Sequence, residues 1–327
     1  MKARIISTGA YLPEKILTNK DLESIVETSD EWITTRTGIK KRHIAAKNET
    51  TSDMGVIAAK RAIEKAGISY DKIDAIIVAT ITPDMLFPST ASFIQKKLGI
   101  TSIPCFDIGA ACTGYIYALV TAAQFIKCGA FKNVLLVAAE KLSAITDWED
   151  RSTCVLFGDG AGAAIVSGER GNMEIGEFFL GTDGRFTDIL NVPGGGVFCP
   201  ASEESIKNKM HFLKMKGQEV YKYAVKYMCE SAEKVLAKAN ISSESIDCLL
   251  PHQANMRIIK AVGKRLKIPQ EKIYLNVHDC GNMSAASSSV GLDGVLKKHN
   301  GNQKILMVAF GAGLTFGSLL LEGMDNQ

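Results

Sequence analysis

Cys112 is the residue whose type and position best suit covalent chemistry. The residues around it predict a short strand over 103–108, a tight turn over 109–111, and a helix over 112–127 that carries almost no charge before its last turn. A helix that apolar is expected to be buried. Cys112 would then begin the helix, where unpaired N–H groups and the helix dipole favour an anion and lower the pKa of a thiol. This position indicates a nucleophile, although most free cysteines are only small buried hydrophobic residues.

Two segments about 170 residues apart resemble each other, which indicates an internal duplication. Residues 66–78 predict the end of a helix, a turn and a buried strand, and residues 239–250 repeat this pattern. The same offset relates 96–100 to 264–268 and 134–138 to 305–309. We therefore expect two α/β halves, 1–172 and 173–327, each with mostly parallel strands covered by helices on both faces.

The duplication relates Cys112 to a position near Asn282, which follows a strand predicted over 273–277. His252 follows a second predicted strand, 246–250. Ligands of open α/β sheets bind outside the carboxyl ends of the strands. The two halves are therefore expected to bring these three side chains together.

Composition restricts the class of protein. The 327 residues are 46% hydrophobic and 22% charged, which is typical of a soluble globular enzyme, and a net charge of +3 argues against nucleic acid or a membrane surface as the main partner. The eight cysteines include no CxxC pair, which indicates reduced thiols and a cytoplasmic protein. The first residues predict a strand rather than a signal peptide, and no run approaches the roughly 18 apolar residues of a membrane span.

Residues 194–209 contain three consecutive glycines with several serines and charged residues, which predicts a long irregular loop. Such a loop could cap a substrate channel or could be a solvated insertion. The sequence favours neither hypothesis over the other.

Four motifs occur in order along the chain: Asp-Ile-Gly-Ala-Ala-Cys-Thr-Gly at 107–114, Pro-His-Gln-Ala-Asn at 251–255, Gly-Asn-Met-Ser-Ala-Ala-Ser at 281–287, and Phe-Gly-Ala-Gly-Leu-Thr-Phe-Gly at 310–317. In this combination the chain resembles, over essentially its whole length, the β-ketoacyl-acyl carrier protein synthase III family of thiolase-fold condensing enzymes. The resemblance implies an α/β, thiolase-like fold of two pseudo-duplicated halves, layered α-β-α-β-α. It also implies a homodimeric acyltransferase with a coenzyme A thioester as substrate and with neither a cofactor nor a metal.

By this resemblance Cys112, His252 and Asn282 form the catalytic triad. Cys112 would be acylated by a short acyl-CoA, acetyl-CoA by expectation, and would then condense with malonyl-acyl carrier protein to start fatty acid synthesis. An acyl-enzyme requires a thiolate, and loss of carbon dioxide places negative charge on a thioester oxygen, which His252 and Asn282 would stabilise as donors. The resemblance places the oxyanion hole for acylation at the backbone N–H groups of Cys112 and Ala312, where the family often has glycine.

The resemblance also assigns the coenzyme A contacts. Trp32, Arg36 and Arg151 would surround the adenine, because an indole and a guanidinium are both planar and stack well on it. Asn255 would contact the pantetheine arm. Without the resemblance, Trp32 would be expected in the core and Arg151 would be an ordinary surface charge.

The helix predicted after the Pro-His motif has a basic face opposite an apolar one. Arg257, Lys260, Lys264 and Lys267 make up the basic face. Most such faces are only solvated. Beside an active-site entrance, however, this one would suit an acidic acyl carrier protein, with Lys214 as a further contact.

Phe87 falls where family members insert a side chain from the partner subunit into the acyl pocket. A bulky ring at this position indicates a short primer such as acetyl. Leu190 and the loop 194–209 are expected to shape the same channel.

Other hypotheses keep part of this picture. A specialised homologue with the same triad would prime polyketide or quinolone synthesis, or would transfer an acyl group without decarboxylation. A homologue that serves only as a scaffold would be expected to have lost a triad residue, and all three are present. A thiolytic relative would be expected to carry a second cysteine within 310–317, and this chain has none there.

Overall fold

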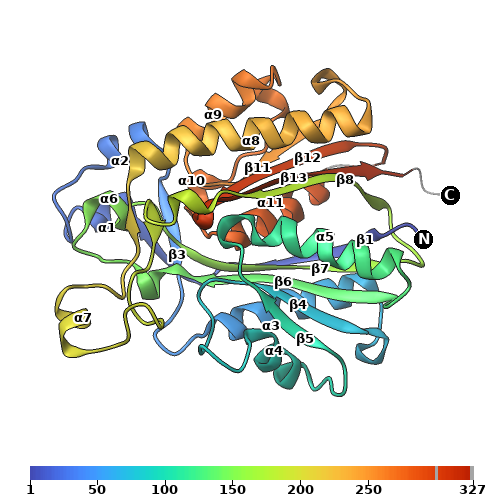
Figure 1. Ribbon diagram of the computed structural model, residues 1–327, viewed down its shortest axis with the longest axis horizontal. Coiled ribbons are helices and arrows are strands. Elements are labelled where there is room, and N and C mark those ends of the chain that lie inside the picture. The colour runs from blue at the N-terminus through green and yellow to red at the C-terminus, as the bar shows by residue number, and fades with distance from the viewer. Residues whose placement is uncertain (299–300, 325–327) are drawn as a thin grey trace.

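The computed structural model of the chain describes residues 1–298 and 301–324, and its largest feature is a mixed sheet of nine strands (Figure 1). The strands follow the order β11-β12-β13-β8-β1-β7-β6-β4-β5, and two short pairs, β2 with β3 and β9 with β10, lie outside this sheet. The strands are β1 (Arg4–Tyr11), β2 (Lys15–Thr18), β3 (Lys41–Ile44), β4 (Ala75–Ala79), β5 (Cys105–Ile108), β6 (Asn133–Lys141), β7 (Asp159–Ser167), β8 (Met173–Thr182), β9 (Leu190–Asn191), β10 (Lys214–Met215), β11 (Cys248–Pro251), β12 (Lys304–Gly311) and β13 (Thr315–Gly323).

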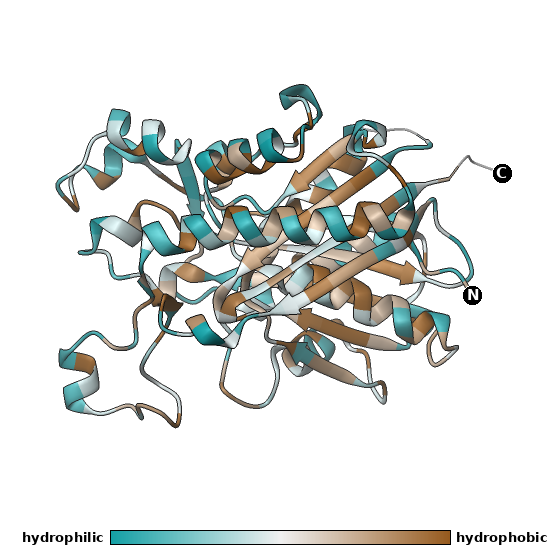
Figure 2. Ribbon diagram, turned by 45° about the horizontal axis from the view of Figure 1, so that its top comes forward, coloured by the Kyte–Doolittle hydropathy of each residue, from teal (hydrophilic) through white to brown (hydrophobic). Residues whose placement is uncertain are grey.

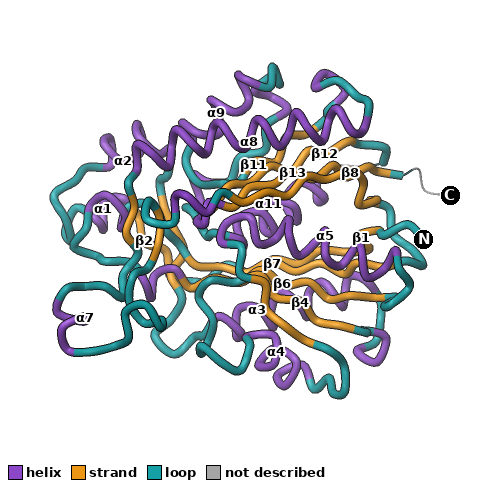
Figure 3. The backbone as a smooth tube through the Cα atoms, viewed as in Figure 1, coloured by secondary structure: helices purple, strands orange, loops and turns teal. Residues whose placement is uncertain are grey.

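Helices cover both outer faces of the sheet, and two further helices lie between the strands of its first half and those of its second half (Figures 1 and 3). Helices α3 and α4 pack outside the strands of the first half, α8 and α9 pack outside those of the second, and α5 and α11 lie between the two sets of strands. This is the expected α-β-α-β-α layering. The helices are α1 (Asn19–Leu22), α2 (Asp30–Thr37), α3 (Thr51–Ala66), α4 (Thr90–Leu98), α5 (Gly114–Lys127), α6 (Arg151–Cys154), α7 (Glu203–Lys207), α8 (Gly217–Ala239), α9 (Met256–Arg265), α10 (Val277–Cys280) and α11 (Ala285–Lys298).

Hydropathy follows the layers. Figure 2 shows apolar strands in the interior and a polar outer surface on α8. The buried apolar side chains of α5 belong to one cluster with Ala285, Leu292 and Val295 of α11, and this cluster also contains residues from both sets of strands. The central layer is therefore a shared core for the two halves, which fixes the segments at the starts of α5 and α11 relative to each other.

The two sets of strands meet at β1 and β8. Arg4 pairs there with Glu174, and Ile5 pairs with Met173. On one side of this junction the sheet contains β1, β7, β6, β4 and β5, which all come before residue 173. On the other side it contains β8, β13, β12 and β11, which all come after residue 172. The strand order agrees with a division into residues 1–172 and 173–327, which stays a prediction.

The duplication is visible at two helix-to-strand connections. Helix α3 ends at Gly67 with φ of 62°, and α8 ends at Asn240 with φ of 54°, so both helices close with a left-handed residue. A short 3₁₀ turn and a parallel strand, β4 or β11, follow each one. The carboxylates of Asp74 and Asp247 then each accept a hydrogen bond of 2.8 Å from the N–H that begins the neighbouring strand, β6 or β12.

The prediction of mostly parallel strands is wrong. Strand β4 pairs in parallel with β5 and β6, and β11 pairs with β12, but β7 runs antiparallel to β1 and β6, and β13 runs antiparallel to β8 and β12. Short connections such as 312–314, between β12 and β13, require antiparallel neighbours. A continuous apolar run predicts burial on both faces but says nothing of strand direction.

Three local predictions also need correction. Residues 273–277 form a single bridge from Ile273 to Leu249 rather than a strand, and α10 follows at once. Cys112 lies in a 3₁₀ turn, Ala111–Thr113, immediately before α5 rather than inside it. The segment 194–209 is not wholly irregular, because it contains α7, which Ser202 caps through a hydrogen bond from the Ser205 N–H.

Candidate active site

Cys112, His252 and Asn282 line one cavity of about 790 Å³. Cys112 comes from the turn before α5, His252 directly follows β11, and Asn282 lies between α10 and α11. Their exposed fractions are 9%, 3% and 7%, so each side chain is shielded from bulk water. The volume is within the range of about 300–1,000 Å³ usual for small-molecule sites. The fold therefore brings the three predicted residues to one cavity.

The turn that carries Cys112 packs directly against the connection after β12. Ala111 has φ of 45°, and a methyl group placed on Gly311 would lie 2.6 Å from the Cys112 nitrogen. The Thr315 hydroxyl donates a hydrogen bond of 2.9 Å to the carbonyl of Ala110, which ties the two segments together. Gly311 is therefore required by space, because any side chain there would displace the Cys112 backbone.

Ala312 begins the 3₁₀ turn Ala312–Leu314 and lines the cavity. It does not have a positive φ, so alanine is accommodated without backbone strain where the family often has glycine. Two backbone hydrogen bonds between Asp183 and Leu314, of 2.8 and 2.9 Å, hold this turn in place. The backbone N–H of Ala312 remains a prediction as an oxyanion donor.

His252 is neutral at neutral pH. Burial lowers the pKa of its imidazole to about 4. Within the described chain neither ring nitrogen has a hydrogen-bond partner, so one N–H and one lone pair are free for a ligand. The Gln253 side chain fixes the loop, because it donates to the Pro251 carbonyl at 2.8 Å and accepts from the Asn276 N–H at 2.9 Å.

The orientation of the Asn282 amide is fixed by its neighbour. Its Oδ1 accepts a hydrogen bond of 2.8 Å from the backbone N–H of Ser284. The amide nitrogen, which carries two donors, is therefore the part of the side chain left for the cavity.

Burial raises the pKa of the Cys112 thiol to about 12. This is the opposite direction to the expectation from a helix terminus. In an enclosed cavity the thiolate loses its hydration, and this loss outweighs the partial positive charge at the start of α5. At neutral pH the cavity therefore holds a neutral thiol and a neutral imidazole.

Comparison with known proteins shows the family of this chain. Residues 106–184 match the family described as 3-oxoacyl-[acyl-carrier-protein (ACP)] synthase III, and residues 236–322 match the C-terminal part of the same family. A relative from Caldanaerobacter subterraneus subsp. tengcongensis, named beta-ketoacyl-[acyl-carrier-protein] synthase III, is 50% identical over 98% of this chain and 97% of its own length. The chain belongs to the β-ketoacyl-acyl carrier protein synthase III family.

Solved structures of this family superimpose over nearly the whole chain. The 3-oxoacyl-[acyl-carrier-protein] synthase III of Aquifex aeolicus is 46% identical, with a TM-score of 0.90 over 98% of this chain and 99% of its own. The priming β-ketosynthase of the R1128 polyketide pathway is 33% identical, with a TM-score of 0.90 over 100% of this chain and 97% of its own. The thiolase-like fold and the condensing-enzyme class are thereby confirmed.

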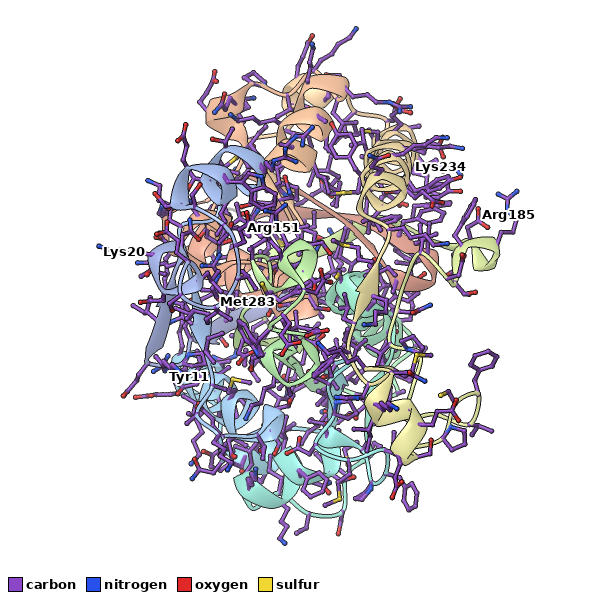
Figure 4. The ribbon with its side chains drawn as sticks, turned by 90° about the vertical axis from the view of Figure 1, so that its left-hand side faces the viewer. Tyr11, Lys20, Arg151, Arg185, Lys234 and Met283 are labelled. Atoms are coloured by element: carbon purple, nitrogen blue, oxygen red, sulfur yellow. The ribbon has the colours of Figure 1, made fainter. Side chains whose placement is uncertain are left out.

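Three of the four residues predicted for coenzyme A line the synthase cavity. Trp32 and Arg36 come from α2, and Asn255 caps the start of α9. Arg151, at the start of α6, borders a smaller hollow with Glu27 and Glu149 instead, on the side of the molecule shown in Figure 4. Its guanidinium nevertheless contacts the indole of Trp32, which lines the cavity, so Arg151 lies beside the site.

Three of the four residues of the predicted basic face lie on α9, and the fourth, Lys267, is exposed two residues beyond the end of that helix. Arg257, Lys260 and Lys264 are exposed, while Ile258 and Val262 are buried against the strands of the second half. Ile259 is buried in a separate cluster that also contains residues of the first half. Arg257 also lines the cavity, so the basic face begins at the opening of the synthase site. Lys214 is half-buried in β10 and is not part of the cavity lining.

The two residues predicted for the acyl pocket differ in position. Leu190 lines the cavity, whereas Phe87 is 84% exposed and lies outside the lining within a single chain. The loop 194–209 contributes none of the lining residues described, and Val197 and Phe198 at its tip are more than nine-tenths exposed. This position favours the solvated insertion over the cap.

Sequence reasoning missed Glu140 and Ser284. Ser284 lines the cavity next to Asn282, and Glu140 is fully buried at the end of β6. The available signal for Glu140 was a carboxylate that directly follows the apolar run 134–139. Each of the eight cysteines is unpaired, and the described residues contain no group of three or more His, Cys, Asp or Glu side chains suited to a metal ion.

Proposed function

We propose that this synthase starts fatty acid synthesis by taking a short acyl group, acetyl by preference, from coenzyme A onto Cys112 and condensing it with malonyl-acyl carrier protein. The observation that carries this proposal is the single cavity that joins Cys112, His252 and Asn282 to Trp32 and Asn255. The family relationship at 50% identity over nearly the whole chain supports the same reaction.

In the acylation step the Cys112 sulfur attacks the thioester carbonyl. The carbonyl oxygen gains negative charge, which the N–H groups of Cys112 and Ala312 would stabilise from the two segments that pack at Gly311. Collapse of the tetrahedral intermediate releases coenzyme A as its thiolate. The acyl group then remains on Cys112, and the thiol proton has passed to a base.

In the condensation step the malonyl thioester loses carbon dioxide, and its carbonyl oxygen becomes an enolate. A neutral His252 and the Asn282 amide nitrogen would each donate a hydrogen bond to that oxygen. The enolate carbon attacks the acyl thioester, and Cys112 leaves as a thiolate that must regain a proton. Because decarboxylation generates the carbanion, no base is needed to remove a proton from carbon.

Two surface features support the proposed partners. The exposed basic face of α9 at the cavity opening suits an acidic acyl carrier protein, with Arg257, Lys260 and Lys264 as contacts and Lys214 nearby. The consecutive residues Met85, Leu86 and Phe87 are 56%, 82% and 84% exposed, which is unusual for apolar side chains and suits burial in a homodimer.

Within residues 1–298 and 301–324, no helix has the length and apolar character needed to cross a bilayer.

A second function is favoured by one observation. The structural relative from the R1128 pathway is a priming ketosynthase for polyketide synthesis, at 33% identity and with the same fold. A specialised priming role would use the same triad and would differ in the acyl group or in the carrier of the second substrate.

Intact-mass spectrometry of the protein mixed with a panel of acyl-CoAs tests the proposal. Wild-type protein is expected to gain the mass of an acetyl or other short acyl group, and Cys112→Ala is expected to gain none. Adding malonyl-acyl carrier protein should then remove the adduct and release carbon dioxide. An adduct that persists with malonyl-acyl carrier protein but is discharged by another acceptor would favour the specialised role, and no adduct on Cys112 with any acyl-CoA would refute both.

A further inference from the structure

Glu140 is a fully buried carboxyl group that the proposed reaction does not yet use. Its Oε2 accepts three hydrogen bonds: from the Thr80 hydroxyl at 3.1 Å, from the Ile81 N–H at 3.1 Å, and from the Thr82 hydroxyl at 2.7 Å. Its Oε1 has no hydrogen-bond partner among the described residues. The carboxyl group is thus held rigidly by one oxygen, and the other oxygen is left free.

Ser284 is a buried residue near both this carboxyl group and the reactive sulfur. It is 1% exposed, it lines the cavity, and its backbone is held at φ of 47° by the hydrogen bond to Asn282. Its hydroxyl is close enough to lower the pKa of both the Cys112 thiol and the Glu140 carboxyl, although neither contact has the geometry of a complete hydrogen bond. A hydroxyl can accept one proton while it donates another.

We propose that Ser284 and Glu140 form a proton path for Cys112, in which the Ser284 hydroxyl connects the sulfur to the free oxygen of Glu140 and Glu140 stores the proton. This proposal rests on the acylation of Cys112 proposed above. Ser284 acts on the reacting sulfur, and Glu140 acts through Ser284 as a positioning and storage group.

The protons balance over one cycle. During acylation the thiol proton moves to the Ser284 oxygen while the Ser284 proton moves to Glu140 Oε1, which leaves a thiolate and a neutral carboxylic acid. Coenzyme A departs as a thiolate and takes its proton from water. After condensation the expelled Cys112 thiolate recovers the stored proton along the same path, and Glu140 is again a carboxylate.

Proton affinity favours Glu140 over His252 as the base. Burial raises the pKa of Glu140 to about 7, whereas burial lowers that of His252 to about 4, and a base works best when its pKa is near the working pH. Other charged groups near Glu140 are engaged elsewhere. The Asp159 carboxylate accepts from Ser143 and Ala45, and the Lys141 ammonium donates to the carbonyls of 46, 47 and 49.

The rate of Cys112 acylation, followed by quenched-flow and intact mass between pH 5.5 and 9, tests the path. Wild-type protein should react faster as the pH rises, with an inflection near 7 where Glu140 ionises. Glu140→Gln keeps the size of the side chain but cannot take the proton, so its rate should fall by about 100-fold and lose the inflection. Ser284→Ala should have the same effect, and the double variant should be no slower than either single one, because both act on one path.

Two further measurements keep the test sharp. The hydrogen bond from the Thr82 hydroxyl is the shortest one to Glu140, and it lowers the pKa of that carboxyl. Thr82→Val removes this bond and raises the pKa of Glu140, so the inflection should move to higher pH. Alkylation of Cys112 by iodoacetamide should show the same pH dependence without any acyl-CoA. A Glu140→Gln protein that keeps the wild-type inflection, with or without a slower rate, would overturn the proton path. If wild-type Cys112 is alkylated with the expected profile but never acylated, the acyl transfer fails and the path stands.

Discussion

The guanidinium carbon of Arg151 lies 4.8 Å from the centre of the Trp32 indole ring. This is a direct cation–π contact, and it leaves no room for an adenine between the two groups. Arg151 also donates a hydrogen bond of 2.9 Å to the Glu27 carbonyl. If adenine is held between Trp32 and Arg151, the arginine must first move off the ring.

Replacement of Arg151 by alanine should weaken the use of acyl-CoA. A contact between the Arg151 guanidinium and the adenine ring would be worth about 1–2 kcal/mol when partly desolvated. Loss of this contact should raise KM for acetyl-CoA by about 5- to 30-fold with little change in kcat. An acetyl-pantetheine substrate without adenine should be used equally well by both proteins. Arg61→Ala, which removes a comparable contact with Tyr11 on the far layer, is the matched control. Equal losses with both substrates would argue against adenine binding at Arg151.

Asn282→Asp separates the two chemical steps. The aspartate can still accept the hydrogen bond from the Ser284 N–H, but it cannot donate to an enolate and it adds a negative charge beside it. We expect acylation of Cys112 to persist and release of carbon dioxide from malonyl-acyl carrier protein to fall by about 100- to 1,000-fold. The two steps are measured by intact mass and by trapped carbon dioxide. Loss of acylation to the same degree would show that Asn282 serves the first step as well.

The sequence predicted the residues whose signal is local. Cys112 stands before an apolar helix, and His252 and Asn282 follow from the duplication and the motifs, so their meeting in one cavity could be expected. Strand direction could not, because a strand buried on both faces reads the same in either orientation. The neutral state of Cys112 could not either, because its pKa depends on how completely the folded cavity excludes water.

Trp32 and Arg151 illustrate a second limit. Nothing in their local sequence distinguishes them from a core residue and a surface charge, and only the family resemblance indicated a ligand. Glu140 shows the reverse case, in which a local signal was present. A carboxylate that directly follows the apolar run 134–139 needs a physical reason, and the fold supplies three hydrogen bonds to it from Thr80, Ile81 and Thr82.

Reversal of charge at Arg257 tests carrier docking. Arg257→Glu should reduce the rate with malonyl-acyl carrier protein by about 10-fold at low ionic strength, because rim charges act mainly on association, and the difference should shrink with added salt. Acylation by acetyl-CoA should be unchanged. Lys60→Glu makes the same charge change on α3 in the opposite outer layer and should affect neither step. If both steps fall together in Arg257→Glu, carrier docking at α9 is refuted.

Glu140 should make stability depend on pH. Its pKa is about 7 in the folded chain against 4.5 ordinarily, so between these values the folded state holds a proton that the unfolded state releases. Stability is therefore lost as the pH rises from 4.5 to 7, by about 3 kcal/mol in total. Glu140→Gln cannot ionise and should escape this loss.

Urea unfolding of wild-type protein and Glu140→Gln at pH 5 and pH 8 measures the effect. The free energy of unfolding of the variant relative to wild type should rise by about 2–3 kcal/mol between the two pH values. His252, with its pKa lowered to about 4, has the opposite sign and destabilises the fold as the pH falls below 6.5. Both proteins contain His252, so this contribution cancels. A constant difference at pH 5 and pH 8 would contradict a raised pKa at Glu140.

Gly311→Ala should damage the oxyanion site through space alone. Gly311 has φ of −151°, which alanine adopts freely, but its methyl group would lie 2.6 Å from the Cys112 nitrogen and 3.0 Å from the Ala111 Cβ. The Cys112 N–H must then move, and loss of one oxyanion donor costs about 100- to 1,000-fold in rate. Gly196→Ala, where a methyl group would meet nothing within 4 Å, is the matched control. Acylation of Cys112 at the wild-type rate in Gly311→Ala would mean that this N–H does not bind the developing charge.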